Sequence, residues 1–259
     1  MTAFEDILVE RDGPVLTITI NRPESGNKLR AQTCLEIVDA LRRLKMDPAL
    51  RVGVLTGVGE KFFCIGGEHD ETTMVDPSQV IPIVDVYQAI DTGPKPVIAA
   101  VNGFAVGGGN VLANVCDLTV AADTAVFRQV GPMVGSFDAG YGTWYLEDAI
   151  GRKRAKEMWY LNRKYSAEQA LAMGLVNEVV PSEDLRARAV EVAREITTRS
   201  PLAIGGLKAA FSARHHGVSG QARMAHDQQL TLYLQTDEAH EVSAAFSERR
   251  EPKSESFWS

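Results

Sequence analysis

Residues 94–113 read PKPVIAAVNGFAVGGGNVLA, and this stretch decides the fold class. The run from Pro96 to Val101 is apolar without alternation, as expected of a strand buried on both faces in an α/β protein. The glycines 107–109 follow it and begin an apolar helix. Glycines at a helix start leave backbone N–H groups accessible, and the helix dipole adds positive potential there. The stretch therefore predicts either a site for an anion or developing oxyanion, or close packing of helix on strand.

The segments on either side of this stretch predict an α/β core. Two β-rich runs, 7–10 and 15–20, flank Asp12-Gly13-Pro14, which predicts a hairpin. Further along the chain we predict helix 33–45, strand 51–56, helix 78–90, strand 96–101, helix 108–116 and strand 118–121. Because the unit is strand-strand-helix, a spiral of ββα turns fits better than a plain doubly wound sheet.

The chain after residue 140 is predominantly helical. Ser166 and Gln169 form a capping-box pattern, while Gly151 and Gly174 stand where helices commonly end. The predicted elements are helices 141–150, 152–161 and 166–173, strand 175–180, and helices 182–199, 201–215, 218–234 and 237–250. We therefore expect a core at 1–197 and a helical region at 198–259 that docks on the core or on a neighbouring subunit.

The composition is that of an ordinary globular protein. Of the 259 residues, 45% are hydrophobic and 24% are charged, and the net charge is −7, which argues against nucleic acid as a partner. The three cysteines are odd in number and lack CxxC spacing, so disulfides and zinc ribbons are poor interpretations. The N-terminus lacks a signal-peptide pattern, and no apolar run approaches the roughly 20 residues of a membrane span. We expect a cytoplasmic protein without membrane partners.

A second strand-to-glycine junction lies about 40 residues before the first. Gly66 and Gly67 follow an apolar run there, so the two junctions can converge two N–H donors on one substrate oxygen. The glycine-rich loop 131–142 adds Ser136 and Asp138, which we consider candidates for polarising a substrate. The alternative for Asp138 is capping of the helix at 141–150.

Several well-known site patterns are absent from the sequence. There is no G-x-G-x-x-G fingerprint, no P-loop, no G-x-S-x-G elbow and no HExxH pair. We therefore predict no dinucleotide site, no hydrolase triad and no metal site.

Residues 94–113, together with the later run from Cys116 to Asp123, resemble the enoyl-CoA hydratase/isomerase (crotonase) superfamily. The resemblance covers nearly the whole chain. It implies a spiral ββα core, a helical C-terminal trimerisation region, and a homotrimer or a dimer of trimers. It also implies acyl-CoA substrates whose thioester oxygen sits between the N–H groups of Gly67 and Gly108.

The same resemblance bears on coenzyme A. It implies that CoA enters only as part of the substrate and that no cofactor is tightly bound. We further consider Asn27, Lys28, Arg30 and Ile65 candidates for CoA binding, and the alternative for Lys28 and Arg30 is a solvated surface role.

The chain departs from the hydratases at both acid/base positions. The glutamate that hydratases carry in the helix after the three glycines is Val111 here, and their second glutamate is Gly131. Valine and glycine transfer no protons, so simple hydration of an enoyl-CoA is disfavoured.

The loop 131–142 resembles two other subfamilies more closely, the 1,4-dihydroxy-2-naphthoyl-CoA synthases and the 2-ketocyclohexanecarboxyl-CoA hydrolases. One closes a ring and the other opens a β-keto ring, and both pass through a CoA enolate. In synthases with glycine at this position, bicarbonate replaces the missing carboxylate. Gln129, Gly131 and Trp159 match that site, whereas Val130 replaces its usual threonine.

Two further differences concern the substrate. The loop from Glu68 to Thr73 is acidic, where the synthases carry basic residues for a substrate carboxylate. The family tyrosine of the C-terminal helix is Leu234, with Tyr233 one residue away. His69 and Tyr233 are secondary candidates for proton transfer, and the alternative for His69 is a solvated loop residue.

We expect hydrolytic ring opening of a cyclic β-ketoacyl-CoA through an enolate. The alternatives left open are the ring-closing synthase, an enoyl-CoA hydratase or isomerase, and a non-catalytic CoA-binding subunit.

Overall fold

The computed structural model describes residues 4–68, 81–134, 136–138, 140–224, 230–253 and 257. The chain divides into two compact units, a core unit, Met1–Ile204, and a C-terminal unit, Gly205–Ser259. The functional division expected at residue 197 stays a prediction. The cavity described below belongs entirely to the core unit.

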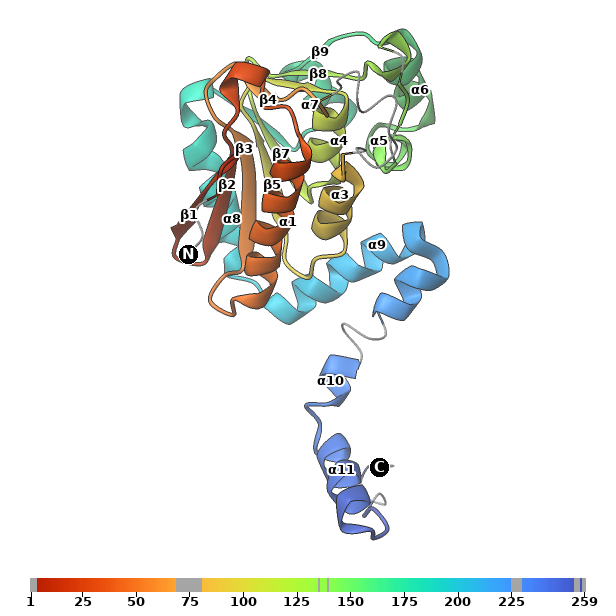
Figure 1. The fold of residues 1–259 in the computed structure, drawn as a ribbon. Helices are drawn as coiled ribbons and strands as arrows, with labels where there is room; N and C mark the ends of the chain where they lie inside the picture. The colour runs from red at the N-terminus through yellow and green to blue at the C-terminus, as the bar shows by residue number, and fades with distance from the viewer. Residues whose placement is uncertain are drawn as a thin grey trace. The chain divides into compact units, whose positions relative to one another are not determined.

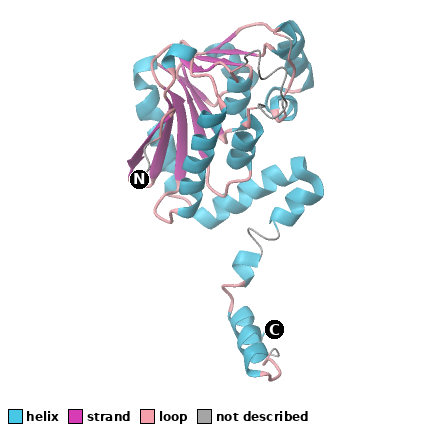
Figure 2. Ribbon diagram, in the orientation of Figure 1, coloured by secondary structure: helices cyan, strands magenta, loops and turns pink. Residues whose placement is uncertain are grey.

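The larger sheet of the core unit has six strands (Figure 2). In spatial order they are β1 (Ile7–Asp12), β2 (Val15–Ile20), β3 (Val52–Gly57), β5 (Val97–Val101), β7 (Leu118–Ala122) and β10 (Glu178–Val180). Strands β1 and β2 are antiparallel, with Asp12 opposite Val15, and all other neighbours are parallel. Gly13 has a φ of +56°, a value that glycine adopts without strain, so the predicted hairpin is confirmed.

The smaller sheet has four short strands. In spatial order they are β4 (Phe62–Cys64), β6 (Phe104–Val106), β8 (Val126–Arg128) and β9 (Tyr165–Ser166). The chain therefore places β3, β5 and β7 in one sheet and the strands that follow each of them in the other. This arrangement confirms the spiral of ββα turns. We did not predict β6 and β8, because three residues are too few to show a period.

Helices cover both faces of the larger sheet (Figure 1). The core-unit helices are α1 (Ala31–Met46), α3 (Ile83–Asp91), α4 (Gly108–Val115), α5 (Gly142–Ile150), α6 (Arg152–Leu161), α7 (Ala167–Met173) and α8 (Leu185–Thr197). On one face, Leu185, Ala189 and Ala193 of α8 pack against a valine-rich strand surface. The other face and α1, α3 and α4 enclose the larger buried cluster. Burial of this apolar surface, at about 25 cal/mol per Å², is the main stabilising contribution.

The predicted helix ends are confirmed. Gly151 and Gly174 follow α5 and α7 with φ values of +77° and +86°. At the start of α7 the Gln169 N–H donates to Ser166 Oγ at 3.2 Å, and the Ser166 N–H donates to Gln169 Oε1 at 2.9 Å.

The described part of the C-terminal unit is helical. Its helices are α9 (Pro201–Met224), which begins in the core unit, α10 (Thr231–Tyr233) and α11 (Asp237–Glu248). Gly217 interrupts α9 with φ +54° and ψ −131°, at the break predicted between residues 215 and 218. Phe211 and Phe246 are 72% and 85% exposed. Such exposed aromatic side chains suit a docking role, which stays a prediction.

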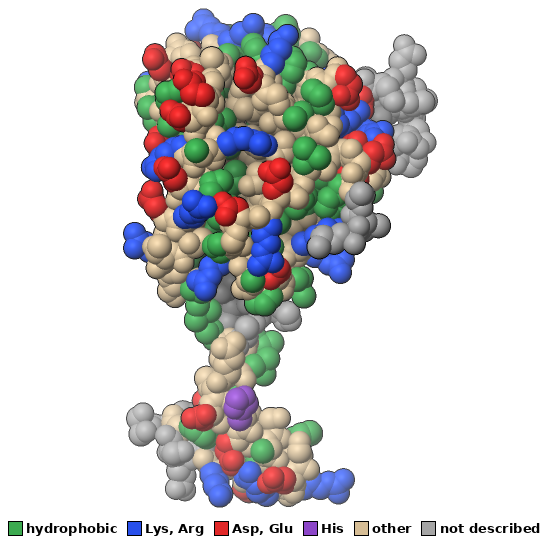
Figure 3. Space-filling view, turned by 90° about the vertical axis from the view of Figure 1, so that its left-hand side faces the viewer, with side chains coloured by type: hydrophobic (Ala, Val, Ile, Leu, Met, Phe, Trp, Pro, Cys, Tyr) green, Lys and Arg blue, Asp and Glu red, His purple; other side chains and the backbone are tan. Residues whose placement is uncertain are grey.

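The described residues hold no helix that is both long and apolar enough to cross a bilayer. Within the same residues, no group of three metal-ligating side chains gathers. On the face drawn in Figure 3, acidic and basic side chains are interspersed.

The cysteines Cys34, Cys64 and Cys116 are free and buried, as predicted for Cys34 and Cys116.

Candidate active site

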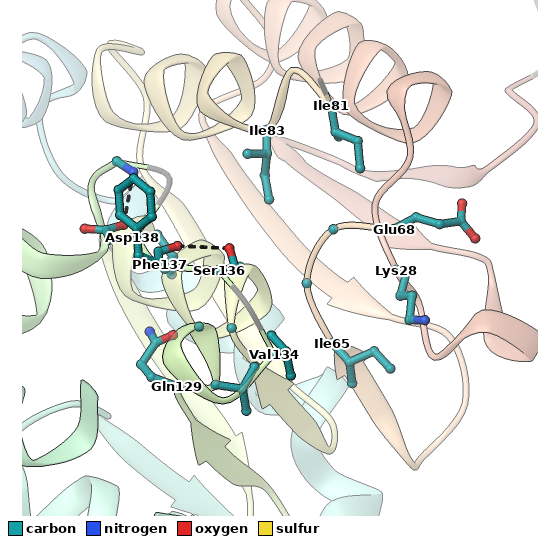
Figure 4. Close-up of a pocket in the computed structure, with 18 of the residues that line it drawn as sticks. Lys28, Ile65, Glu68, Ile81, Ile83, Gln129, Val134, Ser136, Phe137 and Asp138 are labelled. Carbon is teal, nitrogen blue, oxygen red and sulfur yellow. Dashed lines mark hydrogen bonds between the residues drawn. The ribbon is translucent and has the colours of Figure 1, made fainter. Parts of the chain in front are cut away.

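A cavity of about 450 Å³ lies in the core unit where the glycine junctions meet (Figure 4). Its wall combines the loop after β4, the starts of α3 and α4, the segment from Gln129 to Gly140, and Trp159 of α6. In Figure 4, Ser136 and Asp138 lie on one side of the cavity and Lys28, Ile65 and Glu68 on the other. A substrate in this cavity would therefore contact both predicted glycine junctions.

The backbone of Gly67 is oriented by a short parallel pairing with Leu29. The Leu29 N–H donates to the Gly66 carbonyl at 2.9 Å, and the Glu68 N–H donates to the Leu29 carbonyl at 2.8 Å. In such a bridge the central residue directs its own N–H to the opposite side. The N–H of Gly67 therefore points away from Leu29, and Gly67 lines the cavity.

Gly108 is the first residue of α4, and its N–H has no partner within the helix. The preceding Gly107 has φ +54° and ψ −122°, a conformation that favours glycine. Both glycines line the cavity, so the N-terminus of α4 faces the space where a substrate would sit.

The two junctions touch each other through glycines. A Cβ atom on Gly66 would lie 3.2 Å from the Gly108 nitrogen, and Gly66 has a φ of +98°. A Cβ atom on Gly109 would collide with the Cys64 carbonyl at the end of β4. Close packing of the two junctions is therefore confirmed, and it is compatible with the oxyanion site, which stays a prediction.

The two positions that depart from the hydratases both face the cavity. Val111, on the first turn of α4, is 4% exposed, and Gly131 begins a short 3₁₀ turn, Gly131–Met133. The wall at these points is apolar or bare backbone, so neither position supplies a proton donor or acceptor.

The described lining contains two carboxylates, and each is bound to protein groups. Asp138 Oδ1 accepts the N–H groups of Gly140 and Gly142 at 3.0 and 3.1 Å, and Oδ2 accepts that of Thr143 at 2.6 Å. Asp138 thus caps α5, the alternative the sequence left open. Glu68 Oε2 forms an ion pair with Arg22 at 3.2 Å.

Ser136 has a less constrained side chain. Its hydroxyl makes a long 3.4 Å hydrogen bond to the Phe137 carbonyl (Figure 4). Its backbone N–H donates to the Gly131 carbonyl at 2.8 Å, which fixes the loop beneath it. The Ser136 hydroxyl is therefore able to turn toward a bound substrate.

Gln129 and Trp159 present buried polar atoms to the cavity wall. Gln129 is 1% exposed and Trp159 is 9% exposed, and neither Gln129 Oε1 nor Trp159 Nε1 has a partner among the described residues. Asn162 Nδ2 donates to the backbone carbonyls of both residues, at 3.1 and 2.9 Å. Because unpaired buried polar atoms are costly, this wall fits a small polar guest.

The residues expected to bind CoA separate into two groups. Lys28 and Ile65 line the cavity, as Figure 4 shows. Asn27 is fully buried, and its side chain bonds the backbone of Arg22, Val58 and Phe62. Arg30 instead pairs with Glu5 and Asp6. The side chains of Asn27 and Arg30 therefore hold the N-terminal loop rather than face the cavity.

The secondary candidates lie elsewhere. His69 falls outside the described residues. Tyr233 belongs to α10 of the C-terminal unit and is 41% exposed, and Leu234 follows that helix.

The sequence did not single out Tyr87, which lines the cavity from α3. Its hydroxyl donates to the Gly108 carbonyl at 2.9 Å, and the residue is 1% exposed. Burial raises the pKa of its hydroxyl well above the ordinary value, so it remains a neutral donor. The helical period places Tyr87 on the buried face of α3, but that pattern does not separate core from cavity wall.

Cys64, at the end of β4, lies beside this site, but its thiol is unreactive. Burial raises the pKa of its thiol to about 12, so it stays protonated near neutral pH. Nucleophilic catalysis by this thiol is therefore disfavoured.

The alternating two-sheet spiral, with glycine junctions that line one cavity, is the arrangement expected of the crotonase class of acyl-CoA enzymes. The family model for enoyl-CoA hydratase/isomerase matches residues 10–256. The chain belongs to this family.

Solved structures of similar proteins span nearly the whole chain. An enoyl-CoA hydratase from Bacillus anthracis is 31% identical, with a TM-score of 0.78 over 96% of this chain and 98% of that one. An enoyl-CoA hydratase from Polaromonas sp. JS666 is also 31% identical, with a TM-score of 0.76 over 95% and 98%. DspI of Pseudomonas aeruginosa is 27% identical, with a TM-score of 0.78 over 97% and 98%.

Proposed function

We propose that this acyl-CoA enzyme opens the ring of a cyclic β-ketoacyl-CoA by adding water and breaking a carbon–carbon bond. The observation that carries the proposal is the cavity wall at Val111 and Gly131. Gly67 and Gly108, the proposed backbone donors, line the same cavity, but no side chain at residues 111 and 131 transfers protons. Such a site suits the formation of an enolate more than the addition of water across a double bond.

The proposed reaction balances without a further reactant. Water attacks the ring ketone carbon, and the bond from that carbon to the α-carbon then breaks. The electron pair of that bond becomes a thioester enolate, whose oxygen accepts hydrogen bonds from Gly67 and Gly108. A proton then adds to the α-carbon of the enolate. The open-chain product carries a free carboxylate at one end and the CoA thioester at the other.

We assign different roles to the two polar residues of the loop. The Ser136 hydroxyl polarises the ring ketone or directs the attacking water. Asp138 holds the loop on the start of α5, because three backbone N–H groups occupy its oxygens.

We further propose that Lys28 and Ile65 contact the CoA portion and that the C-terminal unit supports a trimer or a dimer of trimers. Lys28 supplies a positive charge for a phosphate in a protein whose net charge is −7. CoA remains part of the substrate.

Bicarbonate is the proposed guest of the Gln129–Trp159 wall. The Trp159 Nε1–H is a donor that a bicarbonate oxygen satisfies, and the Gln129 amide offers a second polar partner. When bound, bicarbonate would supply the carboxylate-like group absent at Gly131. The protein residues would hold and orient it.

The decisive experiment offers the purified enzyme three thioesters: 2-oxocyclohexanecarboxyl-CoA, o-succinylbenzoyl-CoA and crotonyl-CoA. We expect mass spectrometry to show a ring-opened product, one water heavier, from the first only. Ring closure of the second would replace our proposal with the synthase. Loss of ring opening in Ser136→Ala, with the fold intact, would support the role of Ser136.

Hydration of an enoyl-CoA is the second candidate, because two of the similar structures are named enoyl-CoA hydratases. Turnover of crotonyl-CoA without ring opening would favour it and would require a proton-transfer group other than residues 111 and 131. No turnover of any of the three thioesters would favour a CoA-binding subunit.

A further inference from the structure

Tyr87 connects the middle of α3 to the starts of α4 and α5 at the candidate active site. It projects from α3, its hydroxyl reaches the first residue of α4, and its ring lies against Tyr141, which precedes α5. The ring centroids of Tyr87 and Tyr141 are 5.9 Å apart and tilted by 57°. One buried side chain therefore fixes the start of α4 relative to the start of α5.

The hydrogen bond from the Tyr87 hydroxyl ends on Gly108, one of the two proposed oxyanion donors. A Cβ atom on Gly108 would lie 3.1 Å from the Tyr87 hydroxyl oxygen and 2.8 Å from Ile83 Cδ1. The tyrosine and Ile83 thus occupy the space beside the Gly108 α-carbon. The Gly108 carbonyl accepts the hydrogen bond of the tyrosine hydroxyl, which holds the peptide that follows the Gly108 α-carbon. The Gly108 N–H lies on the preceding peptide, whose Gly107 carbonyl accepts the Val111 N–H at 3.1 Å. The two bonds together hold both peptides that flank the Gly108 α-carbon.

Gly108 needs such an anchor because glycine has the widest backbone freedom of any residue. Gly107, Gly108 and Gly109 are consecutive, and no side chain of their own restrains them. An oxyanion donor acts through preorganisation, so a small displacement of the first turn of α4 would weaken it.

We infer that Tyr87 is a positioning residue that fixes the Gly108 N–H in the orientation of an oxyanion donor. The inference rests on the proposed enolate-stabilising role of Gly67 and Gly108. It does not depend on ring opening, because any reaction through this donor pair would require the same anchor.

The test measures polarisation of a thioester that does not react. 4-Aminobenzoyl-CoA has a chromophore conjugated with its thioester carbonyl, and hydrogen bonds to that oxygen shift its absorbance to longer wavelength. We expect a shift on binding to the wild-type enzyme and a clearly smaller shift, at saturation, in Tyr87→Phe. With 2-oxocyclohexanecarboxyl-CoA, we expect kcat to fall about tenfold and KM to change less than about twofold.

Tyr145→Phe is the matched control. Tyr145 stacks on Tyr141 at 5.7 Å, and its hydroxyl donates to buried Asp91, so this variant also removes a tyrosine hydrogen bond from the same aromatic row. Tyr145 does not line the cavity, and we expect the wild-type shift. If the variants only lost fold stability, the absorbance shift would decrease equally in Tyr87→Phe and Tyr145→Phe.

The outcomes are separable. An unchanged shift in Tyr87→Phe would overturn the inference. An absent shift in the wild-type enzyme would overturn both the inference and the Gly67–Gly108 assignment, whereas a shift without ring opening would overturn only the proposed reaction. If Tyr87→Phe fails to fold, 4-fluorophenylalanine incorporated at residue 87 fills the place of the hydroxyl without donating a hydrogen bond. It should reduce the shift, and a full shift would overturn the inference.

Discussion

Asp138 Oδ1 lies 3.1 Å from the backbone nitrogen of Gly142 and accepts its hydrogen bond at the start of α5. The same oxygen accepts the Gly140 N–H, and the second oxygen accepts that of Thr143. A carboxylate with three backbone donors stabilises a helix start, because the first N–H groups of a helix have no partner within it.

This relationship predicts that Asp138 acts mainly on stability. Asp138→Ala is expected to lower the free energy of unfolding by about 1 kcal/mol or more, and Asp138→Asn by less, since its amide oxygen remains an acceptor. Urea denaturation followed by circular dichroism measures both values. We expect kcat of Asp138→Asn to stay within about tenfold of wild type, whereas loss of a general base costs about 100-fold or more. A larger loss with unchanged stability would restore a catalytic role for Asp138.

The contact between Gly109 and Cys64 predicts the most severe substitution. In Gly109→Ala the new Cβ would overlap the Cys64 carbonyl oxygen, a backbone atom of β4 that cannot turn aside. We expect loss of folding, or destabilisation by more than about 3 kcal/mol, in thermal and urea unfolding.

Gly206→Ala is its matched control. Gly206 lies in α9, and a Cβ there meets nothing within 4 Å. Helix propensity alone should then raise stability by roughly 0.5–1 kcal/mol. Equal effects in the two variants would contradict the close packing described here.

Asp6 and Arg30 predict a loss of stability in acid. The hydrogen-bonded guanidinium of Arg30 lowers the pKa of Asp6, against the opposing effect of burial. Since the folded-state pKa lies below the unfolded value of about 3.9, the stabilisation is complete above that value. It is lost as the pH falls through the folded-state pKa.

Arg30→Gln tests this linkage. We expect destabilisation of about 2 kcal/mol at neutral pH, less than for a fully buried pair because the Arg30 side chain is 39% exposed. The acid slope of the unfolding free energy should also become shallower. Arg163→Gln, which removes an exposed pair with Glu157, should leave that slope unchanged. Coincident slopes in wild type and Arg30→Gln would contradict the assignment.

The sequence predicted the two glycine junctions that line the cavity. Gly67 and Gly108 follow strands, and strand-to-glycine junctions are readable from apolar runs and glycine. Side-chain direction is different: Lys28 faces the cavity, but Arg30, two residues away, is bound to Asp6. Periodicity does not report such contacts between distant segments, and for the same reason the bond from Tyr87 to Gly108 was not foreseen.

Lys28 is predicted to act on CoA affinity alone. Lys28→Ala should raise KM for acyl-CoA about fivefold, with less effect at high salt, because it removes one charge from the cavity rim. The matching pantetheine thioester lacks the nucleotide phosphates, so its KM should not change. An equal rise in KM for both thioesters would show that Lys28 contacts another part of the substrate.

The orphaned Trp159 Nε1 predicts dependence on bicarbonate. In buffer freed of carbon dioxide, activity should fall and should return on addition of sodium bicarbonate but not of sodium chloride at equal ionic strength. Trp159→Phe keeps an aromatic ring in the wall but removes the indole donor, so its activity should be low and insensitive to bicarbonate. Its unfolding free energy should fall by about 1–2 kcal/mol, because the smaller ring leaves space in a buried wall, whereas the lost N–H has no partner among the described residues. Bicarbonate stimulation that persists in Trp159→Phe would place the anion elsewhere, and wild-type activity indifferent to bicarbonate would leave that wall without the proposed guest.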